Sequence, residues 1–251
     1  MKLEKIIGEN YEDIKSNVVE TLKKNKDTQV ETLLKLYAQW LNNSSSQNRM
    51  LKKFYEEAQE LLNEKNISYN QEDITNFSIR LSSFEKEKGF AYSGIFLSVL
   101  INNHYECTKT KETYTLILSH ISVPLHRIGA ETNGAHIFVE GNCGEELGYG
   151  MISGSITLDG NCDLAAGYFM RGGAICVKNA KTFFGENMTG GILICDDVEE
   201  IGIQMRGGEL YILKGRLNPE EIDFTEDQKK KITFYYNGKK IFPEEKEIVD
   251  K

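Results

Sequence analysis

The strongest constraint on the fold is a short pattern that recurs at a nearly fixed interval between residues 129 and 213. Four copies align on a glycine followed three residues later by a methionine: Gly148 and Met151, Gly167 and Met170, Gly185 and Met188, Gly202 and Met205. Gly129 opens a fifth, diverged copy, in which Thr132 replaces the methionine. Successive glycines stand 19, 19, 18 and 17 residues apart. Such a period is typical of a solenoid, in which each repeat buries its apolar face only against its neighbours.

Each copy also predicts one β-strand. Two or three residues after the methionine come small residues, among them Gly173, Gly191 and Gly208. Aligned on the methionine column, the position five residues later holds only Ile or Leu, and the position seven residues later is also apolar. This period of two predicts an aliphatic ladder that faces inward on every repeat. The following corner holds Asn142, Asn161 and Asn179, which we expect to stack as an amide ladder.

The chain is therefore predicted to be mostly β, with residues 129–215 forming a single-stranded parallel β-helix of about five rungs. Residues 1–65 show three amphipathic helical periods, at 14–22, 30–41 and 50–62, and predict an α-helical module. Residues 66–128 predict a mixed α/β cap, with strands at 77–81 and 114–121 and a buried helix at 92–100 that Asn102 and Asn103 end. Residues 216–251 predict a linker, a capping hairpin around Asn237-Gly238 and a charged tail.

Charge and cysteine usage narrow the classes of function. The net charge of −8 argues against binding to nucleic acid or to a membrane surface, since both need a basic face. No 18-residue apolar run exists and residues 1–10 are charged, so we expect no membrane-spanning or targeting segment. The five cysteines form no C-x-x-C pair. They favour a reducing compartment, and the protein is expected to be cytoplasmic.

The pattern G-x-x-M-x-G-G followed by alternating apolar residues and G-N resembles the GXGXG β-helix domain. That domain closes the large subunit of glutamate synthase and forms the matching subunit of formylmethanofuran dehydrogenases, and stand-alone archaeal proteins resemble it too. The resemblance covers residues 129–213, about a third of the chain. It implies a right-handed β-helix with an architectural role and no catalytic residues to carry over. The chain lacks the flavin domain and cysteine clusters of the synthase, and its helical module lies outside the family pattern.

Three groups of residues could carry chemistry. Cys143 and Cys162 occupy the same position on successive rungs, which suits either a disulfide or half of a metal site, or a plain duplication of a small residue. Four histidines could hold zinc across the first rungs, although no ligand spacing recurs: His104, His120, His126 and His136. Glu140, Asp159 and Asp196 share a column, which suits either paired catalytic carboxylates or a solvated acidic rim.

We predict no catalytic residue, no metal site and no cofactor. The glycine, methionine and asparagine columns are expected to be structural, and His136, Cys143, Cys162 and the three carboxylates are the surface candidates. The favoured function is a non-catalytic structural or interaction protein that docks on a partner protein or self-associates. One alternative is a structural subunit of a glutamate synthase-like or formylmethanofuran dehydrogenase-like redox complex. Another is a hydrolase or lyase with carboxylates on the β-helix face.

Overall fold

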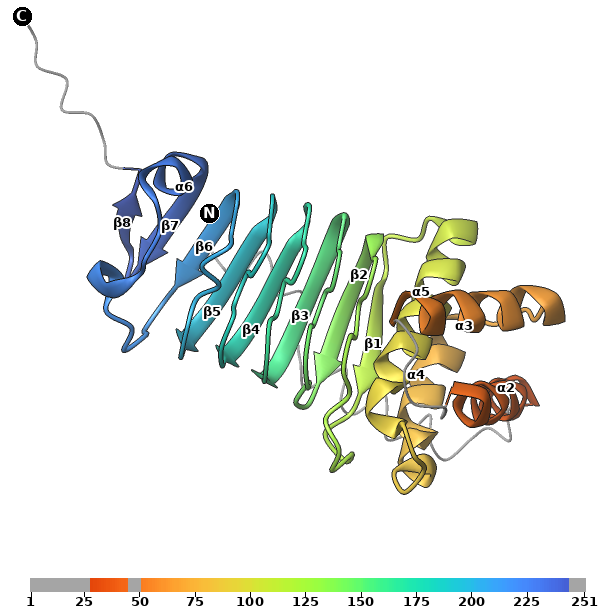
Figure 1. Cartoon of the computed structure of the whole chain (residues 1–251). Coiled ribbons are helices and arrows are strands. Elements are labelled where there is room, and N and C mark those ends of the chain that lie inside the picture. The colour runs from red at the N-terminus through yellow and green to blue at the C-terminus, as the bar shows by residue number, and fades with distance from the viewer. Residues whose placement is uncertain (1–27, 45–50, 244–251) are drawn as a thin grey trace, which may run out of the picture.

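A computed structural model describes residues 28–44 and 51–243 of the chain. Figure 1 shows helices gathered at one end of a long row of strands, and a second small cap at the other end. The strands form a sheet of eight in the sequence order β1 to β8, and seven of the strands run parallel as rungs of a β-solenoid with about five turns. The predicted fold class is confirmed. None of the helices in residues 28–44 and 51–243 is long and apolar enough to cross a membrane.

The helical end is built on an aromatic core. It contains α2 (Thr28–Ser44), α3 (Leu51–Lys65), α4 (Gln71–Arg80) and α5 (Ser93–Thr108). The Tyr37 ring is fully buried and packs edge-on against Phe77, Phe84 and Phe96. The helices predicted at 30–41 and 50–62 are confirmed as α2 and α3, whereas the period predicted at 14–22 lies outside the described residues.

The strand predicted at 77–81 is wrong, because these residues end α4 and enter a 3₁₀ turn at Leu81–Phe84. A capping box starts the helix: the Asn70 side chain accepts from the Asp73 N–H, and the Asp73 carboxylate accepts from the Asn70 N–H. Such reciprocal bonds satisfy backbone donors that a helix otherwise leaves unpaired. Ile74, Phe77 and Leu81 then share one buried face at helical spacing. The alternation that indicates a strand is part of this longer period.

The helix predicted at 92–100 exists, but its predicted end is wrong, because α5 continues through Asn102 and Asn103 to Thr108. The Asn102 amide donates to the Tyr55 hydroxyl at 2.8 Å and to the Ala130 carbonyl at 3.0 Å. Its side chain is therefore used in tertiary contacts and does not compete for the helix backbone. The strand predicted at 114–121 is shorter than expected. β1 spans Thr113–Ile117.

The central rungs are β2 (Asn133–Glu140), β3 (Ser153–Cys162), β4 (Ala174–Ala180), β5 (Ile192–Val198) and β6 (Gly208–Ile212). Their register puts the predicted aliphatic column in line, and every member is buried: Ile137, Ile156, Ile175, Leu193 and Leu210. β1 extends the sheet beyond the repeats, since Tyr114 pairs with Ile137. The helices α4 and α5 pack against β1 and β2 and close this end of the sheet.

The other end is closed by the predicted hairpin. After a 3₁₀ turn at Pro219–Glu221 and the short α6 (Glu226–Lys231), β7 (Ile232–Tyr236) pairs parallel with β6 and antiparallel with β8 (Lys239–Phe242). Asn237 and Gly238 adopt positive φ values of 48° and 75°. These are the two left-handed positions that a type I′ turn requires, so the hairpin prediction is confirmed.

Candidate interaction surface

The corner that precedes each strand is the most unusual part of the solenoid. We call it the corner ridge, and it comprises residues 127–133, 146–152, 165–171, 183–189 and 200–206. In the first four corners, the first, third and fifth residues have positive φ. The third residue is always glycine, with φ values of 72°, 68°, 76° and 77° at Gly129, Gly148, Gly167 and Gly185. A Cβ at Gly148 would overlap the Cδ1 atom of Ile175 on the next rung, so both conformation and space require glycine there.

Seven of the eight flanking left-handed positions in these corners carry side chains, and the exception is Gly150. Arg127, Glu146, Phe169 and Phe183 have φ values between 55° and 61°. A left-handed conformation costs a non-glycine residue about 1–2 kcal/mol, and for a bulky residue it is an outlier. Glycine would make the same corner at lower cost. These side chains are therefore retained despite a conformational penalty, which is a pattern that clusters at functional surfaces.

The corner ridge also carries the exposed large apolar side chains of the described residues. Four such side chains have exposed fractions between 39% and 51%, one on each of four successive corners: Ile152, Phe169, Phe183 and Ile203. Scattered single apolar residues on a surface are ordinary. All four lie along the corners of the solenoid, and this grouping makes the corner ridge a candidate interaction surface.

Two aromatic rings lie beside Phe169, and one of them also contacts a buried arginine. Its ring lies 4.4 Å from the Tyr168 ring and 5.9 Å from the Tyr149 ring, between ring centres. The Arg127 guanidinium sits 4.2 Å from the centre of the Tyr149 ring and forms a nearly buried ion pair with Glu146. Burial raises the pKa of Glu146 against the opposing effect of Arg127. Aromatic and Arg side chains of this kind are enriched in protein interfaces.

The first corner is attached firmly to the helical end. Ser98 on α5 donates to the Arg127 carbonyl at 3.0 Å, and the Ala130 N–H donates back to the Ser98 hydroxyl at 3.1 Å. Asn102 adds its bond to the Ala130 carbonyl. These buried polar groups satisfy one another, so the helices hold the start of the corner ridge in one position.

Two of the three predicted carboxylates are paired with lysines. Glu140 lies beside Asp159 in the strand register. Asp159 forms an ion pair with Lys178, and Asp196 pairs with Lys214 at 3.2 Å. Glu140 accepts a bond from the Ser119 hydroxyl at 2.8 Å. From Asp159 onward the charges alternate as surface ion pairs do, and only Glu140 and Asp159 are neighbours of like charge.

The asparagine column makes bonds along the solenoid axis. The Asn161 N–H donates to the Asn142 side chain at 2.9 Å, and the Asn179 amide donates to the Asn161 side chain at 2.7 Å. Asp197 follows Asn179 in the register, and its carboxylate accepts from the Arg216 N–H at 3.1 Å. The column thus links successive rungs of the solenoid.

The cysteines remain free thiols in this structure. Cys143 and Cys162 are bridge partners on adjacent rungs, and both are buried, so the prediction that they lie at the surface is wrong. Burial raises the pKa of both thiols, for Cys162 to about 12, so neither is a reactive thiolate near neutral pH. Cys176 and Cys195 lie on neighbouring strands but at different register positions, and Cys107 is exposed on α5.

The four histidines bind four different groups. His104 pairs with the Tyr114 hydroxyl, His120 with the Ile79 carbonyl and His136 with the Ser155 hydroxyl, at 2.7, 2.7 and 2.8 Å. His126 accepts from the Glu145 N–H at 2.8 Å. Within the part of the chain that the structure describes, no three His, Cys, Asp or Glu side chains are grouped closely enough to hold a metal ion.

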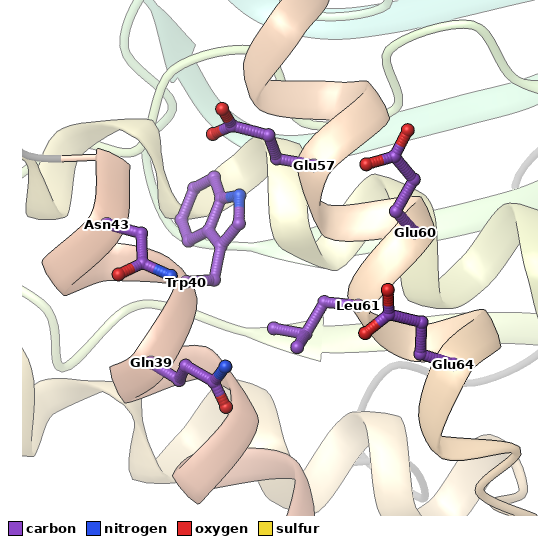
Figure 2. Close-up of a pocket in the computed structure, with 7 residues that line it drawn as sticks. All are labelled: Gln39, Trp40, Asn43, Glu57, Glu60, Leu61 and Glu64. Carbon is purple, nitrogen blue, oxygen red and sulfur yellow. The ribbon is translucent and has the colours of Figure 1, made fainter.

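A hollow of about 390 Å³ lies between α2 and α3 and was not predicted from the sequence. Figure 2 shows Trp40 and Leu61 between the two helices, with three glutamates along α3: Glu57, Glu60 and Glu64. The Trp40 indole N–H donates to the Phe54 carbonyl at 3.1 Å, so its polar atom is satisfied within the module. In the sequence, the spacing of the three glutamates along one helix face is the feature that could have indicated this hollow.

Comparison with known proteins adds no relative. No family model matches the chain, and no curated protein or solved structure matches it either. The function of the chain is therefore inferred from its own surfaces.

Proposed function

We propose that this protein is a non-catalytic docking protein that binds a partner protein through the corner ridge. The observation that carries this proposal is the placement of Ile152, Phe169, Phe183 and Ile203, one exposed apolar side chain on each of four successive corners. Two of these, Phe169 and Phe183, are also held at left-handed positions. A partner that covers them removes apolar surface from water, which offsets both the exposure and the conformational penalty.

The rigid fold supports a docking role. Both ends of the sheet are covered, and the first corner is bonded to α5, so the ridge is presented without rearrangement. A preorganised surface binds more tightly because less conformational freedom is lost on association. The hydrolase alternative has less support, because two of its three candidate carboxylates, Asp159 and Asp196, are paired with Lys178 and Lys214.

The test is affinity purification of the full chain from its native cell extract, with mass spectrometry of proteins that co-elute in stoichiometric amount. We compare the natural chain with a Phe169→Gly/Phe183→Gly double variant. Glycine is favoured at positive φ, so this variant is expected to retain its melting temperature while losing the partner. Phe138→Ala is the matched control, because Phe138 lies half-buried on the outer face of β2.

Retention of the partner by the folded glycine variant would contradict the proposal. The identity of the partner decides a further question. A partner that carries flavin, iron–sulfur or tungsten supports the structural-subunit alternative, in which the chemistry lies on the partner. An intrinsic hydrolytic activity that Asp159→Asn abolishes would replace the docking function with the enzymatic one.

A further inference from the structure

We propose that the partner segment that covers the corner ridge is an amphipathic α-helix with an apolar stripe flanked by carboxylates. The inference rests on the proposed function and specifies the chemistry of the occupant. It depends on the charges beside the apolar residues, on the spacing of those charges and on the width of the apolar surface.

The charges come from one fully exposed row. The residue that follows the Met or Thr column on each corner is exposed on all five rungs: Asn133, Ile152, Arg171, Thr189 and Arg206. This row contains two cations and no acid, although the whole chain has a net charge of −8. α6 adjoins the last corner, where Gln228 donates to the Ile203 carbonyl at 2.7 Å. In α6, Lys229 and Lys231 pair with the exposed Glu226 and Asp227, and Lys230 is exposed as well. An acidic segment is therefore attracted to this row and repelled by most other surfaces of the chain.

Two of the nearby acids on the ridge are engaged within the chain. Glu131 is half-buried and pairs with Arg171 at 2.9 Å, and the half-buried Glu186 accepts from the Gln204 N–H at 3.1 Å. Glu200 is exposed, six residues before Arg206, and it occupies the place in the last corner that Phe183 occupies in the corner before. An exposed pair such as Arg171–Glu131 contributes little stability, so a carboxylate of the partner can compete for Arg171.

The spacing of the row favours a helix over a β-strand. Arg171 and Arg206 are two rungs apart, about 9.6 Å for rungs spaced at about 4.8 Å. On an α-helix, residues i and i+7 share a face and are about 10.5 Å apart. In a β-strand, residues on one face are separated by about 6.8 or 13.6 Å, and neither value matches. A helix can therefore place two carboxylates over the two arginines.

The width of the apolar surface also favours a helix. In the aligned corners, Phe183 lies six positions before the place that Ile152 occupies, so the apolar surface extends across the corner as well as along the axis. A helix with side chains is about 10–12 Å wide and presents an apolar stripe of at least about 100°. A polyproline helix has a suitable repeat of about 9.3 Å for three residues, but it is narrower, and it serves as the competing occupant in the test.

The experiment titrates three labelled synthetic peptides of equal length into the full chain and measures fluorescence anisotropy. The first is a helical peptide with Leu at i, i+4, i+7 and i+11 and Glu on both flanks. The second replaces every Glu with Lys, and the third is an acidic proline-rich peptide. We expect the Glu peptide to bind most tightly. We also expect an Arg171→Glu/Arg206→Glu variant to weaken its binding about tenfold or more.

The matched control is Lys239→Glu/Lys240→Glu, which makes the same charge change on exposed residues of β8. It is expected to leave peptide binding within about twofold, in line with the small effects of distant surface charges. Equal or tighter binding of the Lys peptide or the proline-rich peptide overturns the proposal. So does failure of the Glu peptide to bind, or an equal response of the two charge-reversal variants.

Two further outcomes separate this inference from the proposed function. If Phe169→Gly/Phe183→Gly loses the native partner but the natural chain binds no Glu peptide, the ridge is the docking surface and the acidic helix is the wrong occupant. If the glycine variant keeps its partner, the proposed function itself fails. Sedimentation of the natural chain tests whether a second copy of the chain occupies the ridge. A dimer that Arg206→Glu dissociates identifies a second copy of the chain on the ridge and overturns the helix proposal.

Discussion

Single residues on the corner ridge show that the backbone conformation of a position does not by itself determine which side chain is found there. Gly148 is required by both its φ of 68° and the nearby Ile175 side chain. Phe169 has a similar φ of 55°, yet its side chain points to a surface where it stays 43% exposed. The backbone at this position favours glycine, whereas the residue present is one of the least suited to it. The backbone conformation therefore does not account for a phenylalanine at this position, and the contacts of its exposed ring must do so.

At this scale we predict that Phe169→Gly is more stable than Phe169→Ala by about 1 kcal/mol, since only glycine relieves the left-handed strain. Both substitutions remove the same ring contacts with Tyr149 and Tyr168, so their difference isolates the backbone term. Urea denaturation of the two variants measures it. In β2, at Phe138, the order should reverse, because glycine weakens a strand relative to alanine. A more stable alanine variant at 169 would show that the position is unstrained.

At the scale of the element, the repeat is held together by a match between a methionine and a glycine on adjacent rungs. Met151, Met170 and Met188 are fully buried. A Cβ at Gly173, Gly191 or Gly208 would lie 2.5–2.6 Å from the methyl group of the methionine one rung before. The carbonyl oxygen of the glycine one rung before would also lie 2.9 Å from each added Cβ, so backbone and methionine together favour a residue without a Cβ. This requirement explains why the methionine and the glycine pair recur together.

We predict that Gly191→Ala destabilises the protein by about 2–4 kcal/mol, because it combines a φ of 101° with overpacking against Met170. The cost should fall by about 1 kcal/mol or more in a Met170→Ala background, where the methyl group is absent. Thermal or urea denaturation of the double-mutant cycle measures this coupling. Gly238→Ala is the control, since its φ is 75° and no atom lies within 4 Å of the added Cβ. Gly238→Ala should lose only the stability that the unfavourable positive φ of alanine costs. Additive stability effects of Met170→Ala and Gly191→Ala would contradict a packing contact between the two residues.

At the scale of the whole molecule, the two ends of the solenoid are protected in different ways. The helices α4 and α5 cover β1 and β2 at one end. At the other end β8 is only four residues long, its Lys239 and Lys240 are exposed, and Pro243 follows it. Short edges with lysine and proline prevent strands of other molecules from adding to a sheet. End-to-end stacking is therefore opposed, and association is left to lateral surfaces such as the corner ridge.

We predict that removal of residues 232–251 causes concentration-dependent self-association, because it exposes the unpaired edge of β6. Light scattering or sedimentation over a range of concentrations measures this. A second variant, Lys239→Thr/Lys240→Val, keeps the hairpin and removes only the charges, and it should show a smaller increase in association. If the truncated chain remains folded and monomeric, the hairpin does not protect the edge.

The candidate surface is only partly predictable from the sequence. The glycines of the corners are recognisable in the sequence as a repeat. The apolar residues beside them can be read from the sequence, but their exposure cannot. Their exposure depends on alternating left-handed φ values that have no simple sequence signature when Phe or Arg occupies the position. The carboxylate column is also visible in the sequence, but the ion pair between Asp159 and Lys178 is not. That pair forms between rungs and becomes evident only once the register is known.

Local sequence patterns were enough to predict the solenoid, its inward ladder from Ile137 to Leu210 and the closing hairpin at Asn237-Gly238. These features depend on local periods and turn chemistry, which repeat often enough to exclude other arrangements. Three-dimensional contacts were needed to show that residues 77–81 finish a helix and that α5 passes through Asn102. They were also needed to show that Phe169 and Arg206 face outward on one ridge. These outcomes depend on contacts between residues distant in sequence, such as Asn102 with Ala130, which no local pattern specifies.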